Sequence, residues 1–346
     1  MNNAYAIILA GGNGERFWPV STPERPKQFV SLFGNKALIR HAVDRLEGLI
    51  PPSRTIVITS QRFINLTRKT LPMIPTANII GEPSRRGTAA AVAVACGLVK
   101  RLGGESAVGC VLTADHLMKP VEKFRQTLKD AVQAAKGNEA IVTLGIKPTY
   151  AATGFGYIEC GDKLKGKVLH VKRFVEKPDA KTAETFLKSG KFLWNAGMFI
   201  WRASVMEAEF RKCAPDIARV IGLVAEAKIV TSALKKCYAT VRDISIDYAV
   251  MEKTKSILVV KCDFEWDDVG SWSGLKNQFP ADKAGNVVIG PNAMIDVKSS
   301  VIVTEKDHLI AALGVKDVVI VHTHNATLVC AKDRVQEVKK LLKLIK

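Results

Sequence analysis

Short apolar runs alternate with longer helical patterns over the first half of the chain, and this alternation constrains the fold more than any other feature. The apolar runs cover Tyr5 to Ala10, Thr55 to Thr59, Val108 to Thr113 and Ala140 to Gly145. The helical patterns between them cover Ala37 to Leu49, Thr88 to Leu102 and Val121 to Ala135. Strands that alternate with helices of this length predict an α/β fold, a mostly parallel sheet with helices on both faces. Ligands of such sheets bind at the carboxyl ends of the strands.

The second half of the chain has shorter strands and a change of composition near residue 280. Predicted strands cover Gly156 to Glu159, Val168 to Val175 and Met198 to Trp201. A stretch rich in Pro, Gly and Asn, Phe279 to Asn292, then separates a valine-rich tail. We therefore predict a catalytic domain over residues 1–280 and a small β-rich domain over residues 281–346. Its predicted strands cover Ser300 to Val303, Asp317 to Val321 and Ala326 to Cys330.

The chain ends in a predicted amphipathic helix from Asp333 to Lys346. Its apolar side chains fall on one face at helical spacing: Val335, Val338, Leu341, Leu342 and Ile345. A helix with lysines on the opposite face can lie on a membrane surface. We favour packing onto its own domain, because the apolar face is narrow and has no Trp or Phe.

Charge and composition limit the class of protein and its partners. The chain has 346 residues, and its 51 Lys and Arg against 33 Asp and Glu give a net charge of +18, which attracts nucleic acids, anionic membranes or phosphate-rich substrates. Only 7% of the residues are aromatic and no nucleic-acid recognition signature occurs, which argues against nucleic acid. No apolar run approaches the ~20 residues of a membrane span, and no signal peptide is evident. We expect a soluble cytoplasmic protein without a nucleic-acid or membrane partner, whose seven scattered cysteines are reduced thiols.

The first predicted strand leads into a glycine-rich loop, Leu9-Ala-Gly-Gly-Asn-Gly-Glu-Arg16. Glycines at 11, 12 and 14 allow successive backbone N–H groups to form an anion-binding nest, and Arg16 adds a forked positive charge. A dinucleotide fingerprint would need a glycine where Phe17 stands, and no Walker Gly-Lys-Ser/Thr follows. The loop therefore predicts a phosphate site of another kind.

Motifs throughout the chain carry a family resemblance. The loop continues as Arg16-Phe-Trp-Pro-Val-Ser21 and Pro26-Lys-Gln-Phe29. Seven further motifs follow in order: Glu82-Pro-Ser-Arg-Arg-Gly-Thr-Ala89, Thr113-Ala-Asp-His116, Gly154-Phe-Gly-Tyr-Ile158, Phe174-Val-Glu-Lys-Pro178, Trp194-Asn-Ala-Gly-Met198, Ser245-Ile-Asp-Tyr-Ala-Val-Met-Glu252 and Trp266-Asp-Asp-Val-Gly-Ser-Trp272. Together they resemble the sugar-1-phosphate nucleotidylyltransferases, and within them the bacterial mannose-1-phosphate guanylyltransferases.

The resemblance implies a fold and a reaction. The fold is a Rossmann-like, glycosyltransferase-A-like nucleotidyltransferase domain followed by a β-helix-like domain. In the reaction, the phosphate of mannose 1-phosphate attacks the α-phosphorus of GTP in line, giving GDP-mannose and pyrophosphate. The family uses Mg²⁺ and is expected to form homodimers. Some members carry an isomerase domain after this region; this chain stops at Lys346, so we expect the transferase activity alone.

By the same resemblance, three cations and two acids handle the phosphates. Arg16 and Lys27 hold the triphosphate, and Lys177 bridges the sugar phosphate and the α-phosphate. Asp115, which also contacts the nucleotide, and Asp268 hold the metal, because hard carboxylate oxygens suit Mg²⁺. Asp267 is the adjacent alternative as a metal ligand, and the match to the family motif favours Asp268. Either acid could instead be a turn former or a helix cap.

Base and sugar recognition involve further residues. Ala10, Gly11, Gly12, Gly14 and Thr88 belong to the implied nucleotide site. Guanine offers two neighbouring donors, so either the Glu82 carboxylate or the backbone around Gly87 is expected to read it. The alternative for Glu82 is an ion pair with Arg85 or Arg86. Gly154, Glu176 and Asn195 are assigned to the mannose hydroxyls, with Asn195 in a turn close to the ring.

The chain departs from the family pattern in three places. Gly87 and Ala90 replace Asn and Pro, Thr113 replaces Pro, and His322 and His324 replace acidic residues. Two of these places lie near the nucleotide, so a nucleotidylyltransferase with a different or relaxed base and sugar preference stays open. The two histidines could bind a transition metal, but no third ligand is evident. An inactive regulatory subunit is disfavoured, because Arg16, Lys27, Asp115 and Lys177 are all present.

Overall fold

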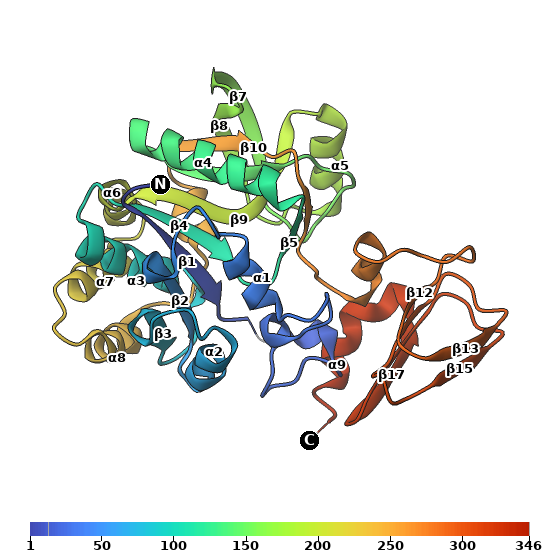
Figure 1. The fold of residues 1–346 in the computed structure, drawn as a ribbon. Helices are drawn as coiled ribbons and strands as arrows, with labels where there is room; N and C mark the ends of the chain where they lie inside the picture. Colours follow the sequence, from blue (N-terminus) through green and yellow to red (C-terminus); the bar gives the residue numbers. More distant parts are fainter. Residues whose placement is uncertain (13, 346) are drawn as a thin grey trace. The chain divides into compact units, whose positions relative to one another are not determined.

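A computed structural model describes residues 1–12 and 14–345, and its chain divides into two compact units (Figure 1). Asn13 of the glycine-rich loop and Lys346 of the predicted terminal helix lie outside the described residues. Unit 1 consists of Met1–Gly11, Ala42–Ala114 and Met118–Trp266. Unit 2 consists of Gly12–His41, Asp115–Leu117 and Asp267–Lys346. These two units do not coincide with the predicted domains, which divide at residue 280. The division at residue 280 stays a prediction.

Unit 1 is built on a nine-stranded sheet with the order β3-β2-β1-β4-β9-β6-β10-β8-β7. Its strands are β1 Ala4–Ala10, β2 Thr55–Ser60, β3 Ile79–Glu82, β4 Val108–Thr113, β6 Ile141–Ile146, β7 Tyr157–Lys165, β8 Val168–Val175, β9 Phe192–Arg202 and β10 Ile257–Lys261. Neighbours among β3, β2, β1 and β4 are parallel, as are β6 and β10, whereas β9 runs antiparallel between β4 and β6. β7 and β8 form an antiparallel pair at the edge. The predicted Rossmann-like mixed sheet is confirmed.

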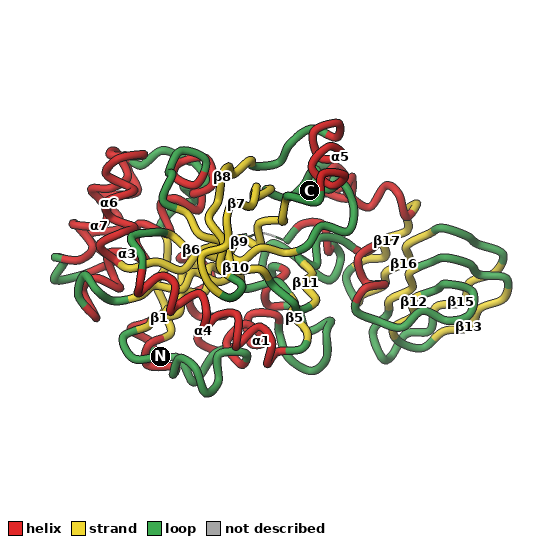
Figure 2. The backbone as a smooth tube through the Cα atoms, turned by 90° about the horizontal axis from the view of Figure 1, so that it is seen from above, coloured by secondary structure: helices red, strands yellow, loops and turns green. Residues whose placement is uncertain are grey.

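Helices cover both faces of this sheet (Figure 2). They are α2 Ile64–Thr70, α3 Gly87–Gly103, α4 Val121–Gly137, α5 Ala180–Ser189, α6 Ala203–Cys213, α7 Pro215–Ala225 and α8 Val230–Thr240. Figure 2 shows α4 on one side of the strands and α3, α6 and α7 on the other. α1 is Leu38–Asp44, shorter than the predicted helix. A small sheet pairs β5 Leu117–Lys119 with β11 Glu265–Asp267.

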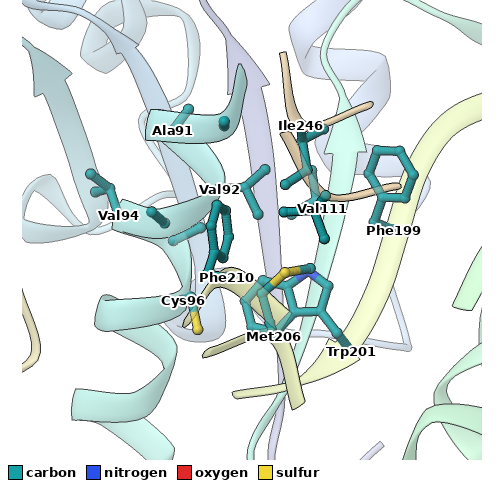
Figure 3. Close-up of a cluster of buried hydrophobic side chains, with 14 of the residues drawn as sticks. Ala91, Val92, Val94, Cys96, Val111, Phe199, Trp201, Met206, Phe210 and Ile246 are labelled. Atoms are coloured by element: carbon teal, nitrogen blue, oxygen red, sulfur yellow. The ribbon is translucent and has the colours of Figure 1, made fainter. Parts of the chain in front are cut away.

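The main core surrounds α3, which is apolar on every side. All residues from Ala89 to Val99 are buried, so this helix packs against the sheet and against other helices at once. Figure 3 shows Val92 of α3 beside Val111 of β4, Trp201 of β9 and Met206 of α6. Ile246 belongs to the same cluster and anchors the segment that precedes the turn Asp247–Met251.

Unit 2 contains a coil of short strands that pack valines inward. The strands are β12 Val287–Ile289, β13 Asn292–Ile295, β14 Val301–Val303, β15 Ile310–Leu313, β16 Val318–Thr323 and β17 Ala326–Ala331. β12, β14 and β16 stack in parallel and β13 stacks on β15, which gives the successive coils of Figure 2. The buried side chains of this coil share a core with Phe17 and Trp272. The predicted β-rich C-terminal region is confirmed.

Two local predictions are wrong. The terminal helix from Asp333 to Lys346 is a 3-10 turn, Lys332–Glu337, followed by one α-helical turn, α9 Val338–Leu341. Val335 and Val338 are buried in unit 2, but Leu341 and Ile345 are exposed, so their apolar face has no buried packing to stabilise a longer helix. Asn195 lies inside β9 rather than in a turn; positive φ at Gly197 makes an irregularity in the strand there.

The seven cysteines are all free thiols, as predicted, and three of them are fully buried. Within residues 1–12 and 14–345, no helix has both the length and the apolar character that a membrane crossing requires.

The close packing of Gly109 against Trp201 gives a stability prediction. A Cβ on Gly109 in β4 would overlap the Trp201 ring, whereas a Cβ on Gly222 in α7 would meet no atom within 4 Å. We expect Gly109→Ala to lower the free energy of unfolding by about 1–3 kcal/mol through overpacking. Gly222→Ala should instead raise it by about 0.5–1 kcal/mol, because alanine favours the helix. Urea unfolding of both variants measures this contrast, and equal effects would contradict the packing described.

Candidate functional site

The predicted site residues fall into two groups, one in each unit. Unit 1 contains Ala10, Gly11, Glu82, Gly87, Thr88, Gly154, Glu176, Lys177 and Asn195. Unit 2 contains Gly12, Gly14, Arg16, Lys27, Asp115 and Asp268. Each group is described by itself.

In unit 2, Lys27 brings the two predicted metal-binding acids together. Its Nζ lies 3.0 Å from Asp115 Oδ2 and donates to the backbone carbonyl of Asp268 at 2.6 Å. The Lys27 side chain is only 9% exposed, so this ammonium group depends on those oxygens for its stabilisation. One positive charge therefore lies between the Asp115 carboxylate and the Asp268 backbone carbonyl.

The glycine-rich loop packs closely against Lys27. Gly14 has a φ of +63°, and a Cβ there would overlap Lys27 itself, so only glycine allows this approach. The ring of Phe17 lies 5.8 Å from Lys27 Nζ. Arg16, in the turn Glu15–Phe17, is exposed. The loop thus presents one exposed cation and supports one buried cation.

Charges shift the two acids in opposite directions. Burial works to raise the pKa of Asp115, but the positive charge of Lys27 and His116 holds that pKa below its ordinary value. Burial raises the pKa of Asp268, and the nearby charges of Asp267 and Asp115 add to this rise, while Lys27 opposes it. A further cation would relieve this repulsion between carboxylates.

Asp267 is committed to local structure. Its Oδ1 accepts from the N–H of Val269 at 2.7 Å, and its Oδ2 accepts from the side chains of Asn277 and Gln278 at 3.2 Å each. This agrees with the choice of Asp268 as the functional acid of the pair.

In unit 1, Glu82 is the last residue of β3, at the carboxyl end of the parallel strands. Its Oε1 accepts from the hydroxyl of Tyr238 in α8 at 2.6 Å. Arg86 donates from Nε to the backbone carbonyl of the same Tyr238 at 3.0 Å, so both residues contact Tyr238. Burial raises the pKa of Glu82 to about 6, although the Tyr238 hydrogen bond lowers it.

Gly87 begins α3 with a φ of +70°, and its bare Cα lets a distant segment approach. A Cβ there would overlap the backbone of Ile244. The Ile244 carbonyl accepts from the N–H of Ala89 at 3.2 Å, and the N–H of Ile246 donates to Thr88 Oγ1 at 2.9 Å. The first turn of α3 is therefore capped by residues 244–246.

The proposed sugar residues Glu176 and Asn195 and the proposed phosphate residue Lys177 come from two parts of the chain, the segment directly after β8 and the strand β9. Glu176 follows β8, and its Oε1 lies 3.0 Å from Lys177 Nζ. Burial works to lower the pKa of Lys177, but the hydrogen bond and charge of Glu176 raise it overall. Asn195 in β9 is buried and donates from Nδ2 to Asp247 Oδ1 at 3.2 Å. Gly154, in the loop before β7, is exposed.

Tyr238, Ile244, Thr143 and Asp247 are the contacts that sequence reasoning missed. Tyr238 lies on a helix with no site motif, and Thr143 lies in the middle of a buried strand. Asp247 lies inside the family motif Ser245 to Glu252, and this was the sequence signal that could have identified it.

The histidines of the tail contact other side chains. His322 Nδ1 lies 2.8 Å from Thr327 Oγ1, and its ring stacks on His308. His324 lies against Glu305. Among the residues that the structure describes, no group of three or more His, Cys, Asp or Glu is arranged to hold a metal ion.

Two models of known protein families match this chain. A model of the nucleotidyl transferase family matches residues 5–285, and a model of the mannose-phosphate isomerase/GMP-like β-helix domain matches residues 290–345. The chain belongs to the nucleotidyl transferase family.

Its relatives match along almost the whole chain. A mannose-1-phosphate guanylyltransferase of Escherichia coli is 37% identical over 97% of this chain and 74% of its own length. The xanthan biosynthesis protein XanB of Xanthomonas campestris is 38% identical over 100% of this chain and 74% of its own length. A crystal structure from Thermus thermophilus, described as mannose-1-phosphate geranyltransferase, is 34% identical with a TM-score of 0.91 over 99% of both chains.

The raised pKa of Glu82 predicts a pH-dependent stability difference. An acid whose pKa is raised in the folded state lowers stability progressively as the pH rises from its ordinary pKa of 4.5 to its raised pKa of about 6, and the full loss is present above that pKa. Glu82→Gln should therefore raise the free energy of unfolding by up to about 2 kcal/mol at pH 7.5 and change it little at pH 4. Urea unfolding at both pH values measures the difference, and a parallel pH dependence of both proteins would contradict it.

Proposed function

We propose that this chain transfers GMP from GTP to α-D-mannose 1-phosphate, giving GDP-mannose and pyrophosphate. The observation that carries the proposal is the likeness, along nearly the whole chain, to a relative named mannose-1-phosphate guanylyltransferase. The site chemistry agrees with it, because each unit presents cations beside carboxylates, as two phosphorylated substrates require.

The residues divide the work by their chemistry. Arg16, Lys27 and the glycine-rich backbone at Gly11, Gly12 and Gly14, next to Ala10, hold the triphosphate. Lys177 holds the sugar phosphate toward the α-phosphorus. Because the attacking group is a phosphate oxygen of the substrate, no protein nucleophile is required; positioning and charge stabilisation lower the barrier.

Glu82 reads the base in this proposal. Above its pKa of about 6 it is ionised, so its oxygens accept from guanine N1–H and N2–H₂. Tyr238 occupies one lone pair of Oε1 and orients the carboxylate. The Thr88 hydroxyl accepts a hydrogen bond from the N–H of Ile246, and this contact holds the start of α3 in place.

Asp115 and Asp268 suit a divalent cation such as Mg²⁺. Their carboxylate oxygens are the hard donors that Mg²⁺ prefers, and the contact of the Lys27 ammonium with the Asp115 carboxylate and the Asp268 carbonyl supports a preference for positive charge there. When bound, Mg²⁺ would neutralise charge on the phosphates of the nucleotide. Asp115 and Asp268 would hold it together with phosphate oxygens and water.

The remaining parts of the proposal concern the whole protein. Residues 1–280 form the catalytic domain and residues 281–346 the β-helix-like domain. The enzyme acts in the cytoplasm as a homodimer. These assignments rest on the family resemblance.

Steady-state assays of pyrophosphate release test the reaction and its base preference. We expect turnover with GTP and mannose 1-phosphate to exceed that with ATP, UTP or glucose 1-phosphate by at least about tenfold. Glu82→Gln should lower kcat/KM for GTP but not for ATP, because it loses an acceptor oxygen. Absence of turnover with GTP and mannose 1-phosphate would overturn the function, and unchanged base preference would overturn the role of Glu82.

Lys27 gives a separate prediction for metal binding. In Lys27→Met, Asp115 loses its ammonium partner, so Mn²⁺ should bind the nucleotide-free protein about tenfold more tightly, although turnover falls. Electron paramagnetic resonance of free Mn²⁺ measures the affinity. The matched control is Lys283→Met, an exposed lysine of unit 2. Unchanged or weaker Mn²⁺ binding in Lys27→Met would show that Lys27 and the metal do not compete.

A further inference from the structure

Asp247 is a half-buried carboxylate at the proposed sugar site to which the reaction scheme gives no role. It begins the turn Asp247–Met251, and its Oδ1 accepts from Asn195 Nδ2 at 3.2 Å. Burial and the negative charge of Glu176 raise the pKa of Asp247 well above its ordinary value. An acid whose pKa is strongly shifted beside other polar groups is a candidate for a functional role.

The orientation of the Asn195 carboxamide is determined by its partners. Its Oδ1 accepts from the backbone N–H of Gly197 at 3.1 Å and from Thr143 Oγ1 at 3.0 Å. The same hydroxyl lies 3.1 Å from the backbone carbonyl of Met198, so Asn195 and Met198 share its one proton. A backbone N–H can only donate, so the atom facing Gly197 must be the amide oxygen. Asp247 faces the nitrogen end of the same amide.

This arrangement leaves Asn195 with a single kind of hydrogen bond to offer. Oδ1 faces the Gly197 N–H and the Thr143 hydroxyl, whose proton it shares with the Met198 carbonyl, and one N–H goes to Asp247. The second N–H of Nδ2 remains. Asn195 can therefore contact a sugar only as a donor.

An acceptor lies beside that donor. A Cβ on Gly156 would lie 2.5 Å from Glu176 Oε2 and 3.3 Å from the Asn195 Cβ, so Glu176 and Asn195 flank the bare Gly156. A sugar hydroxyl has one proton to donate and lone pairs to accept with, which matches a neighbouring amide donor and carboxylate acceptor.

The position of Asp247 is set from the start of α3. The preceding Ile246 donates its N–H to Thr88 Oγ1 at 2.9 Å, and its side chain is buried in the core of Figure 3. Asp247 is thus held by a rigid element rather than by a free loop, as positioning requires.

We propose that Thr143 and Asp247 are positioning residues that lock Asn195 as a hydrogen-bond donor, so that the site selects a sugar hydroxyl that accepts from Asn195 and donates to Glu176. The inference rests on the proposed function. It adds that selection for one hydroxyl comes from side chains that need not touch the sugar.

Kinetics with monodeoxy analogues of mannose 1-phosphate test this. In the wild-type protein, removal of one particular hydroxyl should lower kcat/KM by about 10–100-fold, because the donor and the acceptor are left unpaired. In Thr143→Val and Asp247→Leu, that loss should shrink to less than about threefold, and KM for the sugar phosphate should rise while KM for GTP stays constant.

Two conservative variants serve as matched controls. Thr143→Ser keeps the hydroxyl and Asp247→Asn keeps an oxygen acceptor, so both should retain the selectivity of the wild-type protein. Thermal unfolding verifies that each variant is folded. Thr143 and Asp247 are in different elements, so loss of folding in one still leaves the other to test the inference.

The outcomes separate this inference from the reaction itself. If mannose 1-phosphate is turned over and the deoxy profile is unchanged in Thr143→Val and Asp247→Leu, the positioning role is overturned and the proposed function stands. Equal losses for every analogue would indicate a merely structural role and would also overturn it. If calorimetry and assays detect neither binding nor turnover of mannose 1-phosphate, the proposed function and this inference both fail.

Discussion

The contact between the start of α3 and residues 244–246 is the constraint on which much of unit 1 depends. It requires a glycine at position 87, because any Cβ would overlap the backbone of Ile244. From this contact the chain leads back to Tyr238, which holds Glu82, and forward to Asp247, which holds Asn195. One segment of backbone therefore positions both a proposed base-reading residue and a proposed sugar-reading residue.

The same contact gives a physical account of one departure from the family pattern. The family usually has Asn where this chain has Gly87, and asparagine tolerates positive φ. In this chain the space beside Gly87 is filled by the Ile244 carbonyl rather than by a side chain. Gly87 therefore acts here through the backbone contact that its missing Cβ allows.

Both units contain charged groups that are shielded from solvent. Lys27 is nearly buried between oxygens of Asp115 and Asp268, and Glu82 and Asp247 are carboxylates whose pKa values burial raises. Lys27 stabilises ionised Asp115, whereas the raised pKa values mean that ionised Glu82 and Asp247 destabilise the free protein and suit a ligand that supplies a hydrogen bond. Only a few of the cations behind the +18 charge take part in these arrangements.

Local sequence patterns were enough to predict those elements whose burial depends on neighbouring residues along the chain. Apolar runs predicted β1, β2, β4 and β6 to within about a residue or two at each end, because a buried strand needs continuous apolar residues. The motifs predicted the family, and the acids and cations assigned from them stay predictions. The terminal helix failed because its apolar periodicity has no buried surface to meet beyond Val338.

The contacts that hold the side chains in place depend on the three-dimensional fold. Sequence periodicity could not place Asn195 in a strand or pair Thr143 with it, because these contacts join positions far apart in the chain. Periodicity also could not show that the Asp267 carboxylate accepts from the Val269 N–H whereas the Asp268 backbone carbonyl accepts from Lys27. This difference depends on the direction of the backbone at the two residues. Residue type determines which hydrogen bonds are possible, and the fold decides which of them are already taken.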